Sequence, residues 1–191
     1  MRTVTPKNAK LIPENAEQVF KGQIFDVYHW RQEMFDGSTE TFEMLKRPDT
    51  IKIIAIKDKK IVILEEEQPD HKFFLDLPGG RHDVEFETEL DAAKREMLEE
   101  TGMSFKTWRL IKVEQPYNKI DWFVYLFVAT DFENQQDQKL DAGERIEVKP
   151  LGFKELKRLL NNPKTQHLPK ELLESCQNIE DLINTAEYKT S

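Results

Sequence analysis

Three glutamates within one short segment have the spacing of a metal-binding site. Residues 79–103 read GGRHDVEFETELDAAKREMLEETGM. Glu96 and Glu100 are four residues apart and Glu99 is three from Glu96, so on a helix their side chains lie on or beside one face. Two such carboxylates about 6 Å apart repel by roughly 3 kcal/mol at an effective dielectric constant near 20. A divalent cation would remove this repulsion, and Mg²⁺ is usually held by one or two carboxylates, waters and substrate phosphates.

A cation bound to these glutamates could promote the hydrolysis of a pyrophosphate. It would neutralise phosphate oxygens and lower the pKa of a bound water, which then becomes a nucleophile near neutral pH. A further carboxylate could accept the proton of that water. The Gly79-Gly80 turn allows a close approach of the backbone, so a glycine carbonyl could be another ligand. The alternative is that the glutamates are the solvated face of an ordinary surface helix.

The helix that carries the glutamates is predicted at residues 89–101. Thr88 followed three residues later by Asp91 is a suitable N-cap, and Gly102 is a natural stop at the C-terminal end. Apolar residues at helical spacing predict the face that packs on the core. They are Leu90, Ala93, Met97 and Leu98.

The rest of the chain predicts a mixed α/β layer structure with a β hairpin module in front. Residues 1–16 are polar and suggest a loose arm, and Asp36-Gly37 suits the turn of a first hairpin. Strands are expected at 24–34, 39–45, 50–56, 60–66, 73–77, 105–113, 122–130 and 146–151, a polar loop at 131–145, and helical segments at 153–160 and 170–188. We expect two parts: an arm and hairpin module at 1–48, and a main domain with C-terminal helices at 49–191.

Composition limits the partners of this chain. Its 191 residues carry a formal net charge of −8 with a pI near 5.2, which argues against nucleic acid as a partner. The single cysteine, Cys176, excludes an intramolecular disulfide and fits a reducing compartment. No apolar run reaches the roughly 18 residues needed to span a bilayer, and the N-terminus lacks the apolar core of a signal peptide. We therefore expect a cytoplasmic protein without a membrane partner.

The glutamate-rich segment resembles the Nudix box, G-x5-E-x7-R-E-U-x-E-E-x-G-U, in which U is aliphatic. Six residues rather than five separate Gly80 from Glu87, whereas the spacing from Glu87 to Met103 is intact. The resemblance implies the Nudix α/β/α sandwich around a mixed sheet, here with an N-terminal antiparallel β hairpin module. The matching residues are Gly80, Glu87, Arg95, Glu96, Met97, Glu99, Glu100, Gly102 and Met103.

The resemblance to Nudix hydrolases also implies roles for single residues. Glu96 and Glu100 match the principal metal ligands, Glu99 an assisting ligand and Gly79 the source of a ligating carbonyl. Arg95 would orient the helix carboxylates by ion pairing. The implied cofactor is Mg²⁺, with Mn²⁺ as a possible substitute. Residues with a structural role in the motif would be Gly80, Glu87 and Gly102.

The N-terminal module resembles that of the ADP-ribose pyrophosphatase branch of the superfamily. The resemblance rests on segments 20–22, 24–27, 36–38 and 46–49. These relatives hydrolyse ADP-ribose and other nucleotide sugars, and they are usually dimers whose N-terminal strands help to build the partner's pocket. In that branch a late acidic loop supplies a further ligand or the general base. Segment 143–148 looks like the end of this loop, so we expect Glu144 in that role, with Asp141 as the alternative.

Substrate contacts are less well defined by the sequence. The branch often has a phosphate-binding Arg in an E-Q-x-R pattern, whereas residues 67–71 here read EQPDH, and it tends to have Ala where this chain has Gly79. Aromatic residues of the hairpin could stack on a base, or they could pack within the hairpin or a dimer interface. The candidates for phosphate contacts are Arg47, Arg81, Lys119 and Arg145, and those for base stacking are Phe25, Tyr28 and Trp30.

The leading expectation is Mg²⁺-dependent hydrolysis of the pyrophosphate bond of ADP-ribose or another nucleotide sugar. The products would be a nucleoside monophosphate and a sugar phosphate, with Glu100, Glu96, Glu144 and Arg95 as the catalytic set. One alternative is a Nudix hydrolase acting on nucleoside triphosphates, dinucleoside polyphosphates or RNA 5′ ends. Another is an inactive nucleotide-binding module, although such a module need not keep all three helix glutamates.

Overall fold

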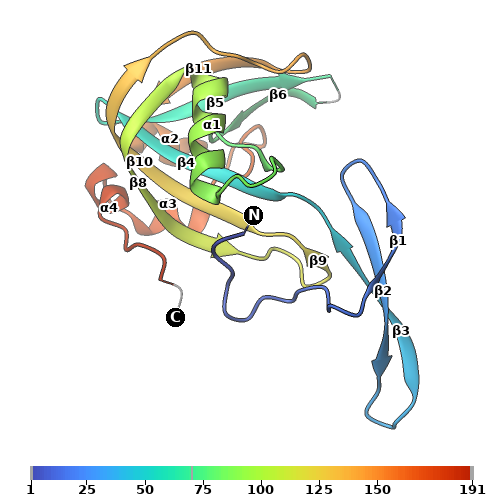
Figure 1. The fold of residues 1–191 in the computed structure, drawn as a ribbon. Coiled ribbons are helices and arrows are strands. Elements are labelled where there is room, and N and C mark those ends of the chain that lie inside the picture. The colour runs from blue at the N-terminus through green and yellow to red at the C-terminus, as the bar shows by residue number, and fades with distance from the viewer. Residues whose placement is uncertain (1, 70, 190–191) are drawn as a thin grey trace.

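The computed structural model describes residues 2–69 and 71–189, whose strands form two sheets (Figure 1). One sheet has the order β1-β2-β3-β9, and the other β11-β5-β4-β10-β8, with β6 attached to β5 and β7 to β4. Each sheet contains one parallel pair, β3 with β9 and β4 with β10, so both are mixed. The strands are β1 (Glu17–Lys21), β2 (Asp26–Glu33), β3 (Thr39–Lys46), β4 (Asp49–Lys57), β5 (Lys60–Gln68), β6 (His71–Asp76), β7 (Arg81–His82), β8 (Met103–Glu114), β9 (Ile120–Asp121), β10 (Val124–Gln135) and β11 (Arg145–Leu151).

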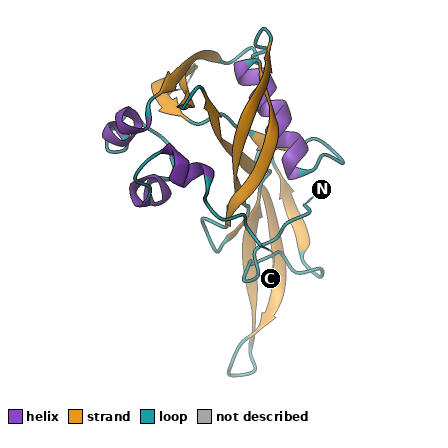
Figure 2. Ribbon diagram, turned by 90° about the vertical axis from the view of Figure 1, so that its left-hand side faces the viewer, coloured by secondary structure: helices purple, strands orange, loops and turns teal. Residues whose placement is uncertain are grey.

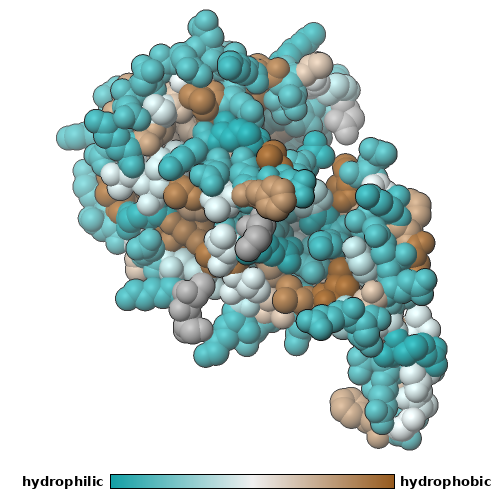
Figure 3. All heavy atoms as spheres, in the orientation of Figure 1, coloured by the Kyte–Doolittle hydropathy of each residue, from teal (hydrophilic) through white to brown (hydrophobic). Residues whose placement is uncertain are grey.

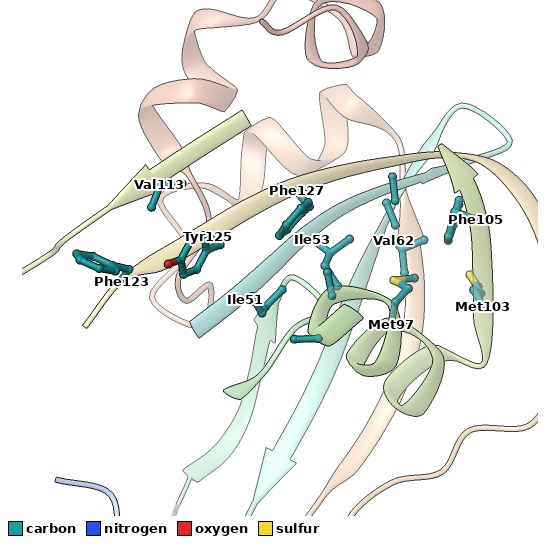
Figure 4. Close-up of a cluster of buried hydrophobic side chains, with 14 residues drawn as sticks. Ile51, Ile53, Val62, Met97, Met103, Phe105, Val113, Phe123, Tyr125 and Phe127 are labelled. Carbon is teal, nitrogen blue, oxygen red and sulfur yellow. The ribbon is translucent and has the colours of Figure 1, made fainter. Parts of the chain in front are cut away.

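Helices cover both faces of the larger sheet, as expected for an α/β/α sandwich. Figure 2 shows α1 on one side and the C-terminal helices on the other. Successive side chains of a strand point to opposite faces. Strand β4 therefore contributes Ile51 and Ile53 to the core beneath α1 (Figure 4) and Ile54 to the core beneath the other helices. The helices are α1 (Glu89–Thr101), α2 (Phe153–Leu159), α3 (Lys170–Ser175) and α4 (Ile179–Ile183).

Helix α1 begins and ends where the sequence predicts. A capping box joins Thr88 and Asp91, and Gly102 takes the left-handed conformation with φ 69°. The buried face differs from the predicted apolar stripe, because Ala92 replaces Leu98, which is only half-buried. Small residues at this face let the helix lie close to β4, and they leave room for a buried carboxylate at the C-terminal end of α1.

The N-terminal arm is held against the main domain, so the prediction of a loose arm is wrong. The guanidinium of Arg2 lies 2.6 Å from one oxygen of Asp49 and 2.5 Å from Asp121. The carboxylate of Glu89 accepts hydrogen bonds from the backbone N–H and the hydroxyl of Thr3, at 2.6 and 2.5 Å. These three acids are at most 5% exposed, and buried charges require such partners. Residues 2 and 3 therefore complete the polar part of the interior.

Replacing Arg2 with Ala should lower the free energy of unfolding by about 3 kcal/mol, because two buried carboxylates would lose their partner. Urea denaturation measures this loss. The matched control is Arg31→Ala, since among the described residues Arg31 donates hydrogen bonds to Thr39 and Thr41 of the exposed hairpin alone, and its loss should cost about 0.5 kcal/mol. Equal losses in the two variants would show that the arm contributes nothing to the fold.

The C-terminal part departs from the predicted continuous helical face at 170–188. Cys176 has extended backbone angles and ends α3, and the side chain of Asn178 then caps α4. Strand β10 runs on to Gln135, so the polar loop predicted at 131–145 spans only 136–144. Among the residues described, no helix combines the length and apolarity needed to cross a bilayer.

The β1–β3 hairpins project from the main body (Figures 1 and 3). They join it through the short parallel pairing of Leu45 in β3 with Ile120 in β9. Several large apolar side chains of this module are exposed, namely Val19, Phe20, Ile24, Phe25 and Phe35. An exposed apolar group of this kind often marks an interaction surface.

Candidate active site

A pocket of about 1170 Å³ lies between the C-terminal half of α1, the first residues of β4, the last residues of β5 and the loop 136–144. The predicted metal-binding residues meet at this pocket, although they come from three separate segments of the chain. We call the part of the pocket where they meet its acidic side. It is formed by four glutamates and the backbone of two glycines, namely Glu96, Glu99, Glu100, Glu144, Gly79 and Gly80.

Glu100 is the most deeply placed of these acids. It is 6% exposed, and its Oε2 accepts a hydrogen bond of 2.7 Å from the backbone N–H of Gly79. Burial raises the pKa of Glu100 well above its ordinary value, and nearby Glu96 adds to this. Gly79 itself has φ +142°, and a Cβ there would lie 2.1 Å from the carbonyl oxygen of Ile51. Only glycine fits this position, because the loop presses directly on β4.

Glu96 lies against the same glycine loop. Burial raises the pKa of Glu96, and repulsion by Glu99 and Glu144 acts in the same direction. A Cβ on Gly80 would lie 2.5 Å from the carboxylate of Glu96. The loop backbone and the carboxylate therefore share one narrow space, which is the kind of oxygen-rich cradle that suits a small divalent cation.

Arg95 connects the acids of the helix to the preceding loop. Its guanidinium lies 2.8 Å from Glu87, 2.8 Å from Glu96 and 3.0 Å from Glu99. It also donates a hydrogen bond of 3.0 Å to the backbone oxygen of Arg81. The structure thus brings Arg95 to the carboxylates that the sequence assigned to it, and a planar guanidinium with several partners holds them in a fixed orientation.

Glu144 reaches the same pocket from the loop 136–144. Burial raises the pKa of Glu144, and the charges of Asp141, Glu66 and Glu99 reinforce the shift. The Glu144 carboxylate accepts a hydrogen bond of 3.2 Å from the Asp141 N–H. Glu66 of β5 is 7% exposed and lines the pocket, but the sequence analysis missed it. Its only signal is strand alternation within the run 65–67, EEE, where the middle residue alone faces inward.

These side chains fit a cation that is completed by other ligands. In residues 2–69 and 71–189, no three His, Cys, Asp or Glu side chains are arranged to hold an ion by themselves. Mg²⁺ does not need such a cage, since it keeps several waters and takes ligands from substrate phosphates. Burial raises the pKa values of Glu96, Glu100 and Glu144, and repulsion between neighbouring carboxylates adds to the shifts. A divalent cation would offset both effects, because it stabilises the ionised carboxylates.

Arg47 also lines the pocket and has unused hydrogen-bonding capacity. Its Nε is the one buried side-chain nitrogen or oxygen of the described residues without a hydrogen-bond partner. Its guanidinium faces the rings of Trp122 and Phe25, at 4.6 and 5.6 Å. Burial and nearby Arg81 lower the pKa of Arg47. Two guanidinium groups beside an acidic cluster could hold phosphate oxygens, which accept strong hydrogen bonds from guanidinium N–H groups.

Other sequence candidates do not reach the pocket of their own chain. Trp30 packs on Phe42 at 5.8 Å, and Arg145 is exposed beside Glu67. Tyr28 and Lys119 are absent from the described lining residues as well. The lining instead includes Tyr117 and Trp122, whose rings are stacked with centroids 6.3 Å apart. No sequence pattern identified these two aromatic residues, because the loop that joins β8 to β10 brings them together.

A protein-family model described as the NUDIX domain matches residues 46–174. The chain therefore belongs to the Nudix family, and it is a hydrolase of the pyrophosphohydrolase class. It is 27% identical over 152 residues to the ADP-ribose pyrophosphatase of Bacillus subtilis (strain 168), which covers 76% of this chain and 80% of the relative. It is also 27% identical over 143 residues to the methanol dehydrogenase activator of Bacillus methanolicus, covering 73% and 77%.

A solved structure supports the fold independently. The crystal structure of an ADP compounds hydrolase superimposes with a TM-score of 0.66 over 89% of both chains, at 20% sequence identity. The Nudix fold predicted from the sequence is thus confirmed, including the antiparallel N-terminal strands. Nudix hydrolases typically use a divalent metal, which agrees with the acidic side of the pocket.

Proposed function

We propose that this protein hydrolyses the pyrophosphate bond of ADP-ribose or another nucleotide sugar with the help of Mg²⁺. The observation that carries the proposal is that one pocket joins the carboxylates of Glu96, Glu100 and Glu144 to the unpartnered Nε of Arg47. Such a pocket suits a diphosphate, because cations bound to the carboxylates and the guanidinium of Arg47 would together neutralise its negative charge. The similarity to an ADP-ribose pyrophosphatase supports this substrate class.

Each part of the pocket then has a function in the reaction. Bound Mg²⁺ would neutralise phosphate oxygens and supply an activated water. Glu96, Glu100 and the carbonyl of Gly79 would hold the cation with help from Glu99, while Arg95 keeps the carboxylates in place. Glu144, or Asp141 beside it, would accept the proton of the attacking water.

The proposed substrate contacts are the guanidinium groups and aromatic rings that line the pocket. Arg47 and Arg81 would bind the diphosphate oxygens. Tyr117 and Trp122, with Phe25 close to Arg47, offer aromatic faces on which a base can stack. The indole N–H of Trp122 donates a hydrogen bond of 3.0 Å to the hydroxyl of Thr50, which fixes the plane of its ring.

A hydrolysis panel with Mg²⁺ tests the proposed function. It should contain ADP-ribose, other sugar nucleotides, dinucleoside polyphosphates and nucleoside triphosphates. We expect ADP-ribose or a sugar nucleotide to give a nucleoside monophosphate and a sugar phosphate at the highest kcat/KM. Preferred release of pyrophosphate from a triphosphate would replace this proposal with the triphosphate alternative. Tight ligand binding without turnover would indicate an inactive binding module.

The stabilising effect of Mg²⁺ should increase with pH. The folded-state pKa values of Glu96, Glu100 and Glu144 are raised above the unfolded value of about 4.3. Without metal, their contribution to stability is therefore complete below that value and is lost as the pH rises through the folded-state pKa values. Mg²⁺ binds the ionised carboxylates, so thermal denaturation should show a larger gain in Tm at pH 8 than at pH 5.5. A gain that is the same at both pH values would contradict the metal site.

The division of the chain and its assembly also belong to the proposal. Of residues 1–48, the β1–β3 hairpins would join two copies, and residues 49–191 would form the hydrolase domain, on which the arm packs through Arg2 and Thr3. The exposed apolar side chains of Val19, Phe20 and Ile24 support a dimer interface on the module. Light scattering should give twice the chain mass of 22.6 kDa, and Phe20→Glu should shift it towards the monomer. A monomeric wild-type protein would exclude the dimer.

A further inference from the structure

A polar cluster outside the acidic site lies in the same pocket, and none of the roles given above uses it. Lys52 lies on β4 between Ile51 and Ile53, whose backbone N–H groups donate to the carbonyls of Gly80 and Pro78, both at 2.9 Å. Lys52 is therefore next to the glycine loop that leads to the metal-binding side chains. Strand alternation turns its side chain out of the core beneath α1, but its ammonium remains close enough to Glu100 to act on the pKa of that carboxyl in the lowering direction.

The cluster consists of three side chains with complementary hydrogen-bonding groups. The Lys52 ammonium lies 2.7 Å from Oδ2 of Asp76, and Nδ1 of His167 lies 3.0 Å from the same oxygen. Asp76 is 3% exposed, and its other oxygen accepts a hydrogen bond of 2.7 Å from the N–H of Leu77. All three residues of the cluster line the pocket.

The loop that carries His167 is anchored to the sheet. The backbone of Leu75 in β6 accepts from the N–H of Gln166 at 2.8 Å and donates to the carbonyl of Lys164 at 2.7 Å. His167 has a positive φ of 49°, a conformation that residues other than glycine adopt mainly where the surroundings enforce it. Its imidazole is thus held at the pocket, although two thirds of its side chain is exposed.

The charge balance of the cluster distinguishes between possible ligands. The ammonium of Lys52 is already neutralised by Asp76, and a phosphate placed against it would also meet the Asp76 carboxylate. A hydroxyl group, by contrast, both donates and accepts. Such a hydroxyl can accept from an N–H of Lys52, because within residues 2–69 and 71–189 the ammonium donates, apart from Asp76, only a long hydrogen bond of 3.5 Å to the Leu77 carbonyl. Asp76 is buried and already paired, so it holds Lys52 and His167 in place, and the remaining ring nitrogen of His167 offers a hydrogen-bonding position to a second hydroxyl.

We propose that Lys52, Asp76 and His167 form a subsite for the vicinal hydroxyls of the sugar on the non-nucleoside side of the diphosphate. The inference rests on the proposed function and narrows it, because it makes a polyol, rather than a plain alkyl group or a further phosphate, the preferred second half of the substrate. The diphosphate would then span from the guanidinium groups to the metal-binding side chains, with the sugar beyond Gly79.

A comparison of two substrates tests this subsite. ADP-ribose carries the hydroxyls, whereas the methyl ester of ADP has the same pyrophosphate bond without them. Lys52→Met and His167→Ala should each raise the ratio of KM for ADP-ribose to KM for the methyl ester about tenfold, the effect of losing a hydrogen bond to a charged or polar partner. His167→Ala should change KM for the methyl ester less than about twofold, whereas Lys52→Met also removes a charge near Glu100 and should change both KM values by a common factor in addition. Lys112→Met is the matched control, since Lys112 lines the same pocket next to Glu114 and should affect the two substrates equally.

The remaining outcomes separate this inference from the proposed function. Equal effects of Lys52→Met on both substrates, or a loss of thermal stability alone, would show that the cluster only holds β4, β6 and the 163–169 loop together. If the wild type cleaves neither substrate, the proposed function fails. In that case the subsite is tested by the binding of ribose 5-phosphate and of methyl phosphate, followed by NMR in the presence of Mg²⁺. A preference for the sugar phosphate that Lys52→Met abolishes supports the subsite. Equal binding of the two phosphates overturns it.

Discussion

Replacing Glu100 with Gln should lower kcat by about 10³-fold or more, because the variant would lose the charge of a proposed metal ligand. The fold should remain intact. The amide of Gln has the shape of the carboxylic acid, and its oxygen can still accept the hydrogen bond from the N–H of Gly79. Burial already raises the pKa of Glu100, so a neutral side chain at this position should leave Tm unchanged or raise it.

Steady-state kinetics at saturating Mg²⁺ and thermal denaturation together measure this effect. The matched control is Glu85→Gln, an exposed acid in the loop before α1 that does not line the pocket in the described structure, and it should keep the wild-type kcat. A Glu100→Gln variant with nearly normal kcat would refute the assignment of the metal site. A variant that fails to fold would show that the Glu100 carboxylate has a structural role that we have not recognised.

Replacing Gly79 with Ala should lower the free energy of unfolding by about 4 kcal/mol, at the upper end of single substitutions. Two effects combine at this residue. Its φ of +142° is unfavourable for any residue with a Cβ, and that Cβ would lie 2.1 Å from the carbonyl oxygen and 2.8 Å from the carbonyl carbon of Ile51. Both contacts are backbone atoms of β4, a central strand, so they cannot move aside cheaply.

Chemical denaturation of the Gly79→Ala and Gly143→Ala variants, compared with each other, measures how much the contact between Gly79 and the backbone of Ile51 contributes to stability. Gly143 also borders the pocket, but a Cβ there would meet only the Pro69 ring at 3.9 and 4.0 Å, so its loss should cost less than about 1 kcal/mol. If the two variants were equally stable, the glycine loop would not press on β4 as described, and the position of the Gly79 carbonyl at the metal site would lose its support.

The sequence predicted α1 and its acids well because the information there is local. The caps at Thr88 and Gly102 lie within one turn of the helix, and helical spacing alone places Glu96, Glu99 and Glu100 together. Even Arg95 and Glu87, which are eight residues apart, belong to the same loop and helix. For such a segment the residue spacing determines most of the geometry.

The parts that were mispredicted depend on contacts between distant residues. Arg2 meets Asp49 and Asp121, which lie 47 and 119 positions further along the chain, and no periodicity signals this. The apolar spacing in 170–188 is compatible with one helix, but Asn178 hydrogen-bonds the backbone N–H of Asp181 and starts a new one. Side chains of this type favour caps over helix interiors, so a local polar interaction outweighed the apolar pattern.

The substrate side of the pocket was the least predictable from the sequence. Lys52 and Asp76 lie on segments whose sequence predicts ordinary buried strands, and His167 lies within a proline-containing loop between two helical segments. Only the anchoring of that loop on Leu75 brings the three residues together. The aromatic pair of Tyr117 and Trp122 likewise depends on a turn between strands. Specificity therefore has to be derived from the tertiary structure.

The central claim is that the acidic end of α1 binds divalent cations, and electron paramagnetic resonance of Mn²⁺ tests it most directly. Titration of the wild-type protein should remove the signal of free Mn²⁺, and excess Mg²⁺ should restore it. In Glu96→Gln and Glu100→Gln, which are folded by circular dichroism, the affinity should fall at least about tenfold. Mn²⁺ binding that is undiminished in both variants would contradict the claim.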